Sequence, residues 1–330
     1  MQPYNKEEAI KKINELSGQK KPFIFIINYL QNSSYIIEVQ NVDPNQLLYN
    51  FNGTNNVPSF DTTDAISNKE VEYTSYPESF EEYSRSFSIV KQNILAGNSF
   101  LANLTCQTPI KTNLTLKEIF MRSKAMYKLW MNDQFVFFSP EIFIRIVEGK
   151  IHSYPMKGTI DATLPNAEQL LMDDQKEAAE HATIVDLIRN DLSIVAEHVY
   201  VERYRYIDRV QTSKGSILQS SSEIVGTLPN NYTERLGDII FSLLPAGSIT
   251  GAPKHKTMQI ISEAENYDRK FYTGVSGYFD GTNLDSAVMI RFIEEDKGKM
   301  YFKSGGGITC QSEVNSEYNE MKQKIYVPIY

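Results

Sequence analysis

The chain has 330 residues, of which 41% are hydrophobic, 12% aromatic and 22% charged. This composition is typical of a folded globular protein and excludes the collagen-like, coiled-coil and low-complexity classes. The 33 basic and 41 acidic residues give a net charge of −8, so clustered cations that would hold a nucleic-acid backbone are not expected. The length fits one large domain or two smaller ones.

The cysteines and the N-terminal segment bear on the compartment. Cys106 and Cys310 are too few and too far apart for a disulfide framework or a cysteine-based zinc site. Residues 1–21 are polar, and the first apolar run, Phe23 to Ile27, has the length of a strand rather than of a signal peptide or a membrane span. We therefore expect a cytoplasmic protein without a membrane segment.

In the first third of the chain, residue patterns predict a helix over 6–16, strands over 23–29 and 34–39, and a loop-rich stretch over 41–75. The stretch 41–75 is rich in Asn, Ser, Thr and Asp, which favour turns over packed elements. Apolar side chains then recur at helical spacing over 80–95, with Gly97 as a stop signal, and a strand over 100–107 follows.

In the rest of the chain, β-rich runs predict strands over 135–138, 143–147, 150–154, 274–279, 287–293 and 300–303. Asp280-Gly281 between two of these runs is typical of a hairpin turn. Helical stretches are predicted over 167–191, which is one helix or a broken pair, and over 233–244, 252–264 and 316–325. Strands in hairpins with helices outside them predict an α+β fold with antiparallel sheets.

One lysine stands in a constrained setting, within Pro155-Met156-Lys157-Gly158-Thr159 after an apparent strand. Proline and glycine fix the backbone there and can aim an amine into a cleft. A free lysine has a pKa of about 10.4, so a nucleophilic lysine needs surroundings that remove its charge. The motif alone leaves a surface lysine as the alternative.

Two helical segments each carry a pair of glutamates at i, i+3: Glu177 with Glu180, and Glu317 with Glu320, the latter followed by Lys324. Like charges at this spacing repel unless a cation separates them. Together the pairs could hold a hard cation such as Mg²⁺, which prefers oxygen ligands. Two solvated helix faces are the alternative.

Two glycine-rich segments could approach a ligand closely. Residues 245–254 form a turn that opens a helix, and its backbone amides and the hydroxyls of Ser248 and Thr250 can receive a carboxylate or phosphate. Its spacing differs from GxxxxGK[ST], which excludes a P-loop NTPase. Ser304 to Gly307 follow a strand, where the missing side chains expose backbone amides, although a triple glycine more often forms a turn than a site.

The order and spacing of these motifs resemble the chorismate-utilising enzymes. The matching segments are SPE at 139–141, PMKGT at 155–159, EHATIVDLIRNDL at 180–192, GSITGAPK at 247–254, SGGG at 304–307 and ExxE with a lysine at 317–324. The resemblance runs from about Phe80 to the C-terminus. It implies two subdomains of antiparallel sheets with outer helices that enclose a cleft, with a variable N-terminal part, 1–78, beside a catalytic domain, 79–330.

Within that family, the sequence most resembles aminodeoxychorismate synthase component I. Enzymes of that branch carry a lysine in PxKGT, matched here by Lys157, where anthranilate synthases usually carry alanine. Isochorismate and salicylate synthases activate water with a lysine at the position of Leu101, and an aliphatic side chain cannot take a proton from water. The resemblance therefore implies amination of chorismate at ring carbon 4.

The resemblance also implies the chemical roles. Lys157 would attack ring carbon 2 while Glu141 protonates the hydroxyl leaving from carbon 4, and ammonia would then add at carbon 4 and expel the lysine. The ring carboxylate of chorismate would sit on Mg²⁺, held by Glu180 and Glu320 with Glu177 and Glu317 nearby. The remaining implied contacts are Tyr272 and Arg291 with the enolpyruvyl carboxylate, and Thr250, Gly305, Gly307 and Lys324 along the site.

The sequence also bears on the source of the nitrogen. The chain shows no Cys/His/Glu set for glutamine hydrolysis, so ammonia is expected from a separate glutamine amidotransferase subunit.

The sequence departs from the family at Ile160-Asp161-Ala162, where an arginine usually follows PxKGT. Three alternatives stay open: anthranilate synthase component I, a non-catalytic chorismate-binding subunit, and a pyridoxal phosphate enzyme with Lys157 as the Schiff base.

Overall fold

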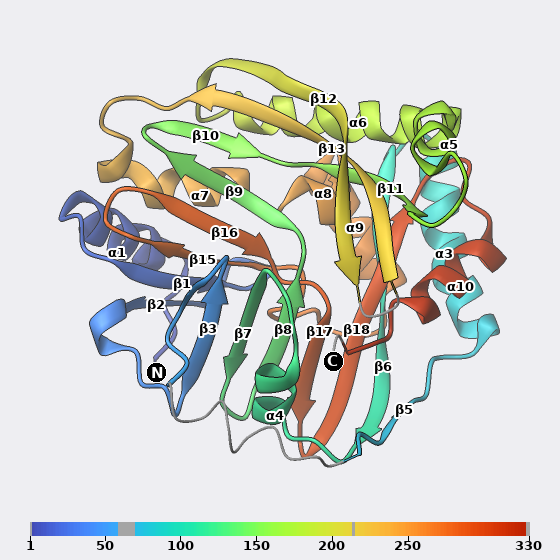
Figure 1. The fold of residues 1–330 in the computed structure, drawn as a ribbon, viewed down its shortest axis with the longest axis horizontal. Helices are drawn as coiled ribbons and strands as arrows, with labels where there is room; N and C mark the ends of the chain where they lie inside the picture. The colour runs from blue at the N-terminus through green and yellow to red at the C-terminus, as the bar shows by residue number, and fades with distance from the viewer. Residues whose placement is uncertain (1, 59–69, 213–214, 328–330) are drawn as a thin grey trace.

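Two antiparallel sheets lie face to face between two layers of helices in the computed structural model, which describes residues 2–58, 70–212 and 215–327 (Figure 1). Within those residues each sheet has nine strands. Sheet A runs through β11 (Met156–Asp161), β13 (Gly215–Thr227), β10 (Lys150–Ser153), β9 (Ile142–Val147), β16 (Leu284–Val288), β15 (Val275–Phe279), β1 (Phe23–Ile27) and β2 (Ser34–Glu38), and β12 (Glu197–Thr212) pairs with β13.

Sheet B follows the same antiparallel pattern. It runs through β14 (Gly251–Ala252), β6 (Leu101–Thr112), β18 (Lys299–Ile308), β17 (Phe292–Asp296), β8 (Phe135–Ser139), β7 (Tyr127–Met131), β3 (Leu47–Phe51) and β4 (Thr54–Asn55), and β5 (Tyr73–Ser75) pairs with β6. The long pair β6 and β18 keeps one register from Ile110 opposite Met300 to Ala102 opposite Ile308.

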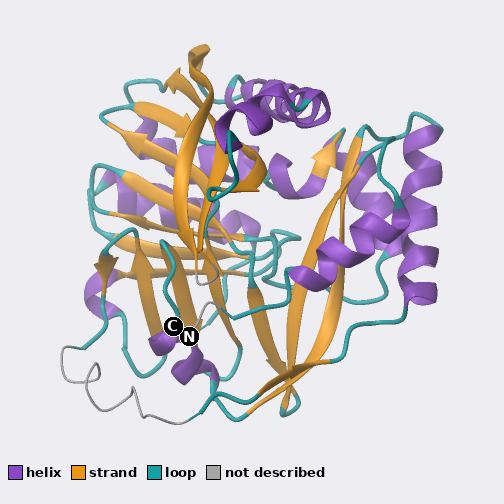
Figure 2. Ribbon diagram, turned by 45° about the vertical axis from the view of Figure 1, so that its right-hand side comes forward, coloured by secondary structure: helices purple, strands orange, loops and turns teal. Residues whose placement is uncertain are grey.

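Helices cover the outer face of each sheet. The apolar core on the outer side of sheet A includes side chains of α1 (Lys6–Gly18), α6 (Gln175–Leu192), α7 (Leu236–Leu243) and α8 (Gly247–Thr250). The core on the outer side of sheet B includes side chains of α3 (Phe80–Leu95), α4 (Leu116–Arg122), α9 (Lys254–Ala264) and α10 (Val314–Gln323). Figure 2 shows helices beside the long strands of sheet B. The shorter elements are α5 (Ala167–Asp173), η1 (Val39–Asn41) and η2 (Tyr232–Arg235).

Strand β1 shows how the sequence produces this layering. All five of its residues are buried. Because successive strand residues point to opposite faces, Phe23, Phe25 and Ile27 join the helix-side core, while Ile24 and Ile26 join a third core between the two sheets. An uninterrupted apolar strand is therefore what a position between two packed layers requires.

Several predicted elements are confirmed. The helix over 80–95 has the predicted bounds, and Ser79 caps it by accepting a hydrogen bond from the backbone N–H of Glu82. The stretch 167–191 is a broken pair, because Asp174 ends α5 and its side chain caps α6 at Glu177 N–H. The expected α+β arrangement of antiparallel sheets with outer helices is also confirmed.

Other predictions were wrong. The stretch 41–75 is not only loop, because β3 lies inside sheet B between β7 and β4; its residues 59–69 lie outside the described part. The strand expected over 287–293 is divided, since the chain leaves sheet A after Val288 and enters sheet B at Phe292, with Arg291 at a φ of 53° between them. The β12–β13 hairpin was missed.

The N-terminal part contributes to both sheets. Strand β1 pairs with β15 in sheet A, and β3 pairs with β7 in sheet B. The domain boundary expected between residues 78 and 79 falls just before α3, and it stays a prediction. In the part of the chain that the structure covers, no helix combines the length and the apolar character needed to cross a membrane.

Candidate active site

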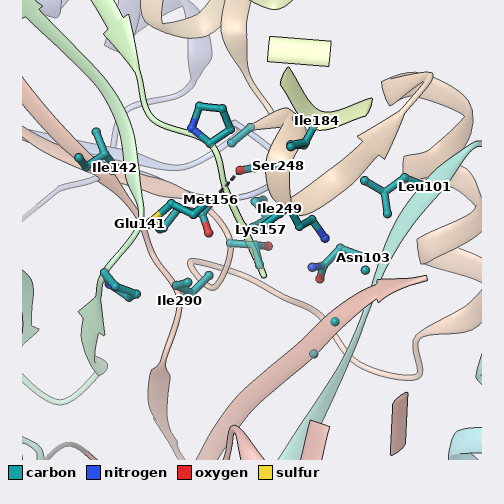
Figure 3. A pocket seen from close by; sticks show the side chains of 18 of the residues that line it. Leu101, Asn103, Glu141, Ile142, Met156, Lys157, Ile184, Ser248, Ile249 and Ile290 are labelled. Carbon is teal, nitrogen blue, oxygen red and sulfur yellow. Dashed lines mark hydrogen bonds between the residues drawn. The ribbon is translucent and has the colours of Figure 1, made fainter. Parts of the chain in front are cut away.

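A cavity of about 680 Å³ lies between elements of the two sheets. Sheet A and its helices supply the beginning of β9, strand β11 and one face of α6 and α8, while sheet B supplies β6, β18 and the end of α10. Figure 3 labels side chains of β6, β9, β11, α6 and α8 around this space. The cavity is therefore built by segments that are far apart in the sequence.

Eleven of the twelve residues singled out from the sequence line this cavity. They are Glu141, Lys157, Glu177, Glu180, Tyr272, Arg291, Gly305, Gly307, Glu317, Glu320 and Lys324. The residue that does not line it is Thr250, whose side chain is fully buried at the end of α8. The Thr250 side chain lies next to the Tyr29 hydroxyl instead, and its role as a substrate contact stays a prediction.

A backbone irregularity places Lys157. In the β11–β13 ladder Lys157 lies opposite Ser220, and the register then shifts so that Thr159 lies opposite Gln219. Gly158 occupies the shift with a φ of 75°, a conformation that glycine adopts without strain. The Lys157 amine lies 3.6 Å from Glu180 Oε2, and a Cβ added to Gly307 would be 3.7 Å from it. The amine thus lies between α6 and β18.

Glu141 lies just before β9, and hydrogen bonds hold both its backbone and its side chain. Its backbone N–H donates to Ser139 Oγ at 3.0 Å, and its carboxyl Oε1 accepts from Ser248 Oγ at 2.5 Å, the contact drawn dashed in Figure 3. Burial raises the Glu141 pKa above its usual value, although the Ser248 hydrogen bond and the charge of Lys157 act in the opposite direction. The net shift favours a protonated carboxyl, the form that a general acid needs.

Helix α6 presents its two glutamates to the cavity. Burial, followed by the neighbouring Glu180 charge, raises the Glu177 pKa. Glu180 is balanced by two amines, Lys157 at 3.6 Å and Lys176 at 4.0 Å. This face of α6 is therefore not simply a solvated surface.

Helix α10 presents the second pair from the opposite wall. Burial and the Glu320 charge raise the Glu317 pKa. Burial alone would raise the Glu320 pKa as well, but Lys324, whose amine lies 2.7 Å from Glu320 Oε1, outweighs it and holds that pKa below its usual value. A Cβ added to Gly306 would lie 3.5 Å from oxygens of both glutamates, so the glycine leaves room beside them.

The four glutamates can be tested as a cation site. Over the described ranges, no three acidic, histidine or cysteine side chains form a ready-made metal cluster. The donor chemistry nevertheless fits Mg²⁺, because four carboxylates from two helices face one cavity and Mg²⁺ prefers oxygen ligands with retained waters. The raised pKa values of Glu177 and Glu317, to which their carboxylate neighbours contribute, fit a site where an added cation would relieve repulsion.

The two residues expected to bind the enolpyruvyl carboxylate differ in burial. Tyr272 is 3% exposed, and burial raises the pKa of its hydroxyl. Arg291 lies between β16 and β17, where its Nη1 donates to the Lys324 carbonyl at 3.3 Å and its guanidinium lies 5.2 Å from the centre of the Tyr326 ring. The arginine is thus held by the chain that follows α10.

Sequence reasoning overlooked two polar residues of the cavity. Asn103 lies on β6 opposite Gly307, and its buried Oδ1 has no hydrogen-bond partner among the described residues. Because alternate residues of a strand share one face, the expected place of Leu101 at the site could have indicated Asn103 as well. Lys303 lines the cavity from β18 with its amine bound to Glu294 and to the carbonyls of Asp268 and Arg269. Lys303 directly precedes the SGGG motif at 304–307, and that position could have indicated it.

Sequence comparison identifies relatives of known and unknown activity. The chain is 48% identical over 323 residues to an uncharacterized PabA-like protein of Haemophilus influenzae, covering 98% of this chain and 97% of that one. It is 30% identical over 259 residues to the aminodeoxychorismate synthase component 1 of Bacillus subtilis, covering 74% and 61%. It is 33% identical over 267 residues to the anthranilate synthase component 1 of Acetivibrio thermocellus, covering 74% and 51%.

Structural comparison finds solved structures that share the fold of this chain. The menaquinone-specific isochorismate synthase from Escherichia coli has a TM-score of 0.74 at 14% identity, covering 98% of this chain and 82% of that one. The anthranilate synthase component I from Streptococcus pneumoniae has a TM-score of 0.66 at 24% identity, covering 81% and 61%. A sequence profile of chorismate binding enzymes matches residues 5–329. With nearly the whole sequence covered by that profile, the chain belongs to the chorismate binding enzyme family.

Proposed function

We propose that this chain is an aminodeoxychorismate synthase component I, which converts chorismate and ammonia to 4-amino-4-deoxychorismate for p-aminobenzoate and folate biosynthesis. The observation that carries the proposal is the place of Lys157, an amine inside the cavity between Glu180 of α6 and Gly307 of β18. Glu141, a carboxyl group with a raised pKa, lines the same cavity. The two groups supply a nucleophile and an acid for one substrate.

The reaction balances with these two groups. The Lys157 nitrogen bonds to ring carbon 2, both conjugated double bonds of the ring diene shift by one position, and the bond from carbon 4 to its hydroxyl breaks. Glu141 gives its proton to that hydroxyl, which leaves as water. Ammonia then bonds to carbon 4, both double bonds shift back, and the bond between carbon 2 and Lys157 breaks. The new ammonium group returns one proton to Glu141, so both residues are restored.

Leu101 supports amination over hydration. It lines the cavity from β6, where its methyl group Cδ1 would be 3.1 Å from a Cβ added to Gly307. An aliphatic side chain at this place cannot activate water. Neutral ammonia already carries a lone pair, so it can add to the ring without a base that removes a proton from it first.

The other cavity residues have binding roles in the proposal. Glu180 and Glu320 would hold Mg²⁺ with Glu177 and Glu317, and the bound ion supplies charge neutralisation for the ring carboxylate. Arg291 would take the enolpyruvyl carboxylate through its guanidinium, with Tyr272 beside it. The residues expected to line the substrate are Gly305, Gly307 and Lys324.

A glutamine amidotransferase subunit is proposed as the source of ammonia. Two of the sequence relatives named above, those of Bacillus subtilis and Acetivibrio thermocellus, are component 1 proteins, a designation that fits a two-component enzyme. We place this assembly in the cytoplasm, in line with the sequence-based expectation. Pull-down of a glutaminase component with the full chain, followed by glutamine-dependent turnover, tests the partner.

One experiment tests the proposed function. The purified chain is incubated with chorismate, Mg²⁺ and ammonium, and the product is identified by mass and by the ring carbon that carries nitrogen. We expect nitrogen on carbon 4 with the enolpyruvyl group retained. Pyruvate release with nitrogen on carbon 2 would identify an anthranilate synthase, the activity named for a relative that is 33% identical.

The remaining alternatives give separate results. Binding of chorismate without turnover would identify a non-catalytic subunit. A pyridoxal phosphate enzyme would show absorbance beyond the aromatic band in the purified protein, and reduction with borohydride would fix the cofactor to Lys157.

A further inference from the structure

We infer that Ser248 is a positioning residue for the proton donor: its hydroxyl holds one oxygen of Glu141 so that the other oxygen faces the substrate. The inference rests on the proposed function, because it assigns a partner to the acid of that reaction. Ser248 Oγ lies 2.5 Å from Glu141 Oε1, and both residues line the cavity (Figure 3). The contact joins α8 to the segment before β9, which are 107 residues apart in the sequence.

The helix that carries Ser248 is held from three directions. Gly247 packs so closely on α6 that a Cβ there would clash with Leu187 and lie 2.8 Å from Asp191 Oδ2. Lys254, at the start of α9, pairs with the same Asp191 oxygen at 2.8 Å and donates to the Leu243 carbonyl at 2.8 Å. These contacts fix the four-residue turn of α8, so the Ser248 hydroxyl has a defined place.

The Ile249 carbonyl provides the third attachment. It accepts from the buried Arg269 guanidinium at 3.4 Å, and Arg269 is itself paired with Glu265. The backbone on both sides of Ser248 is thus tied to neighbouring elements. A hydroxyl held in this way can fix the orientation of a carboxyl group. A hydroxyl on a mobile backbone would instead adjust its own position to the carboxyl group.

The chemistry of proton transfer gives this contact a purpose. A protonated carboxyl group has one carbonyl oxygen that accepts a hydrogen bond and one O–H that can donate. When Oε1 accepts from Ser248, the O–H lies on Oε2 and is available to the leaving hydroxyl. Once the proton has left, Ser248 still donates to the carboxylate, and hydrogen bonds to charged acceptors are the stronger kind. Ser248 therefore both selects the donating oxygen and stabilises the charge that proton transfer creates.

Three charged groups from other elements face the same carboxyl group. They are Lys157 of β11, Lys324 at the end of α10, and Arg291 between β16 and β17. All three favour the carboxylate form, and none of them has a hydrogen bond to Glu141 within the described residues comparable to that of Ser248. Loss of the Ser248 hydroxyl leaves these three charges in place, so its effect can be measured separately.

The test compares Ser248→Ala, Ser248→Thr and the matched control Ser276→Ala. Ser276 lies on β15 outside the cavity, and its buried hydroxyl donates to the Phe25 carbonyl at 2.9 Å. With chorismate and ammonium we expect Ser248→Ala to lower kcat about 10-fold with KM within about twofold of the wild-type value, because binding contacts are unchanged. Ser248→Thr keeps the hydroxyl and should retain kcat within about threefold.

The pH profile is the second readout. Removal of a donor to Glu141 raises its pKa, so the high-pH limb of kcat in Ser248→Ala should move up by about one pH unit. The same pKa shift should appear in the protein without substrate when the Glu141 carboxyl group is titrated by ¹³C NMR. The Glu141 signal is assigned as the one that disappears in Glu141→Gln. A Ser248→Ala profile that matches the wild type, or a threonine variant as slow as the alanine variant, would overturn the inference.

The two proposals fail in distinguishable ways. If the wild-type protein does not aminate chorismate, the proposed function fails, while the carboxyl titration still measures whether Ser248 controls Glu141. If the wild type is active and the titration midpoint is the same in Ser248→Ala, the positioning role alone fails. Thermal unfolding of all variants identifies any loss of fold, and Ser276→Ala reports the cost of removing a buried hydroxyl elsewhere.

Discussion

Lys157 Nζ lies 3.6 Å from Glu180 Oε2, so an amine of β11 and a carboxylate of α6 are paired on the wall of the cavity. Lys176 approaches the other oxygen of the same carboxylate at 4.0 Å from within α6. The two lysines differ in exposure, with 26% of the Lys157 side chain and 53% of the Lys176 side chain open to solvent. They form a natural comparison, since both neutralise Glu180 but only Lys157 faces β18.

Replacement of the cavity lysine should abolish the amination. We expect Lys157→Ala to lower the rate of 4-amino-4-deoxychorismate formation with ammonium by at least about 100-fold, because the variant lacks the amine proposed to form the covalent bond to carbon 2. The rate is measured by chromatography of the product. Lys176→Ala removes the other positive charge near Glu180 and should change the rate by less than about threefold.

The outcome also separates the two amination chemistries. An anthranilate synthase adds ammonia directly to carbon 2 and does not use a nucleophilic lysine, so Lys157→Ala would then leave the rate near the wild-type value. Such a result, with unchanged thermal stability, would contradict the role assigned to Lys157.

Two glycines of β18 should respond differently to alanine. At Gly305 a Cβ would lie 2.6 Å from Thr105 Cγ2 and would meet the Leu104 carbonyl, so Gly305→Ala should lower the free energy of unfolding by about 2 kcal/mol. At Gly307 the nearest atom is Leu101 Cδ1 at 3.1 Å, and the Lys157 amine is next at 3.7 Å.

A methyl group on Gly307 therefore enters the cavity rather than the sheet. We expect Gly307→Ala to raise the KM for chorismate about 10-fold while the free energy of unfolding changes by less than about 1 kcal/mol. Urea unfolding and steady-state kinetics of both variants measure these effects. Equal loss of stability in the two variants would show that Gly307 also has a packing role.

Magnesium should bind through the two glutamate pairs. We expect chelation to abolish amination and Mg²⁺ to raise the thermal unfolding temperature of the wild-type protein. In the double variant Glu177→Gln/Glu317→Gln the apparent Mg²⁺ affinity should fall by at least about 10-fold in both measurements. Glu263→Gln, on the exposed side of α9, is the matched control and should behave as the wild type. Activity that survives chelation would exclude the metal.

Lys128 should make stability depend on pH. Its amine donates to the carbonyls of Phe120 and Ser123 at the end of α4, and burial lowers its pKa to about 8. A lysine in the unfolded chain keeps its proton up to a pH of about 10.4, so between these two values the unfolded state holds more protons. The free energy of unfolding contributed by Lys128 therefore rises with pH across this window.

This dependence can be isolated by difference. We expect the free energy of unfolding of the wild type, minus that of Lys128→Met, to increase by about 1 kcal/mol between a pH of about 7.5 and about 9.5, a value reduced for partial solvent exposure. Lys111→Met, at an exposed lysine of β6, is the control variant and is measured in the same way. A flat difference for Lys128→Met would contradict the effect of burial.

The helices could be predicted from the sequence better than the strand pairings. The helix over 80–95 has apolar side chains at helical spacing and a serine cap, and these signals are local. The hairpin of β12 and β13 was missed because β12 carries charged and tyrosine residues along its length and shows several register shifts. Its pairing depends on contacts with β13 that a residue pattern does not reveal.

The site could be predicted as a set of residues, but its geometry could not. The motif matches named Lys157 and Glu141, yet the Gly158 bulge and the Ser248 hydrogen bond follow from three-dimensional packing. The sequence indicated that the Ser248 hydroxyl could receive a carboxylate or phosphate, and in the structure this hydroxyl donates to the carboxyl group of Glu141. Asn103 belongs to no motif, so only its alternation with Leu101 along the strand could have indicated it, and its place opposite Gly307 follows from the pairing of β6 with β18.

Helix α10 follows all the strands in chain order, and it brings Glu317, Glu320 and, just past its end, Lys324 to the cavity. The amine of β11 and every described strand of both sheets therefore precede α10 in the order of synthesis. Enclosure of the cavity thus depends on a helix that the chain supplies only after the strands against which it docks.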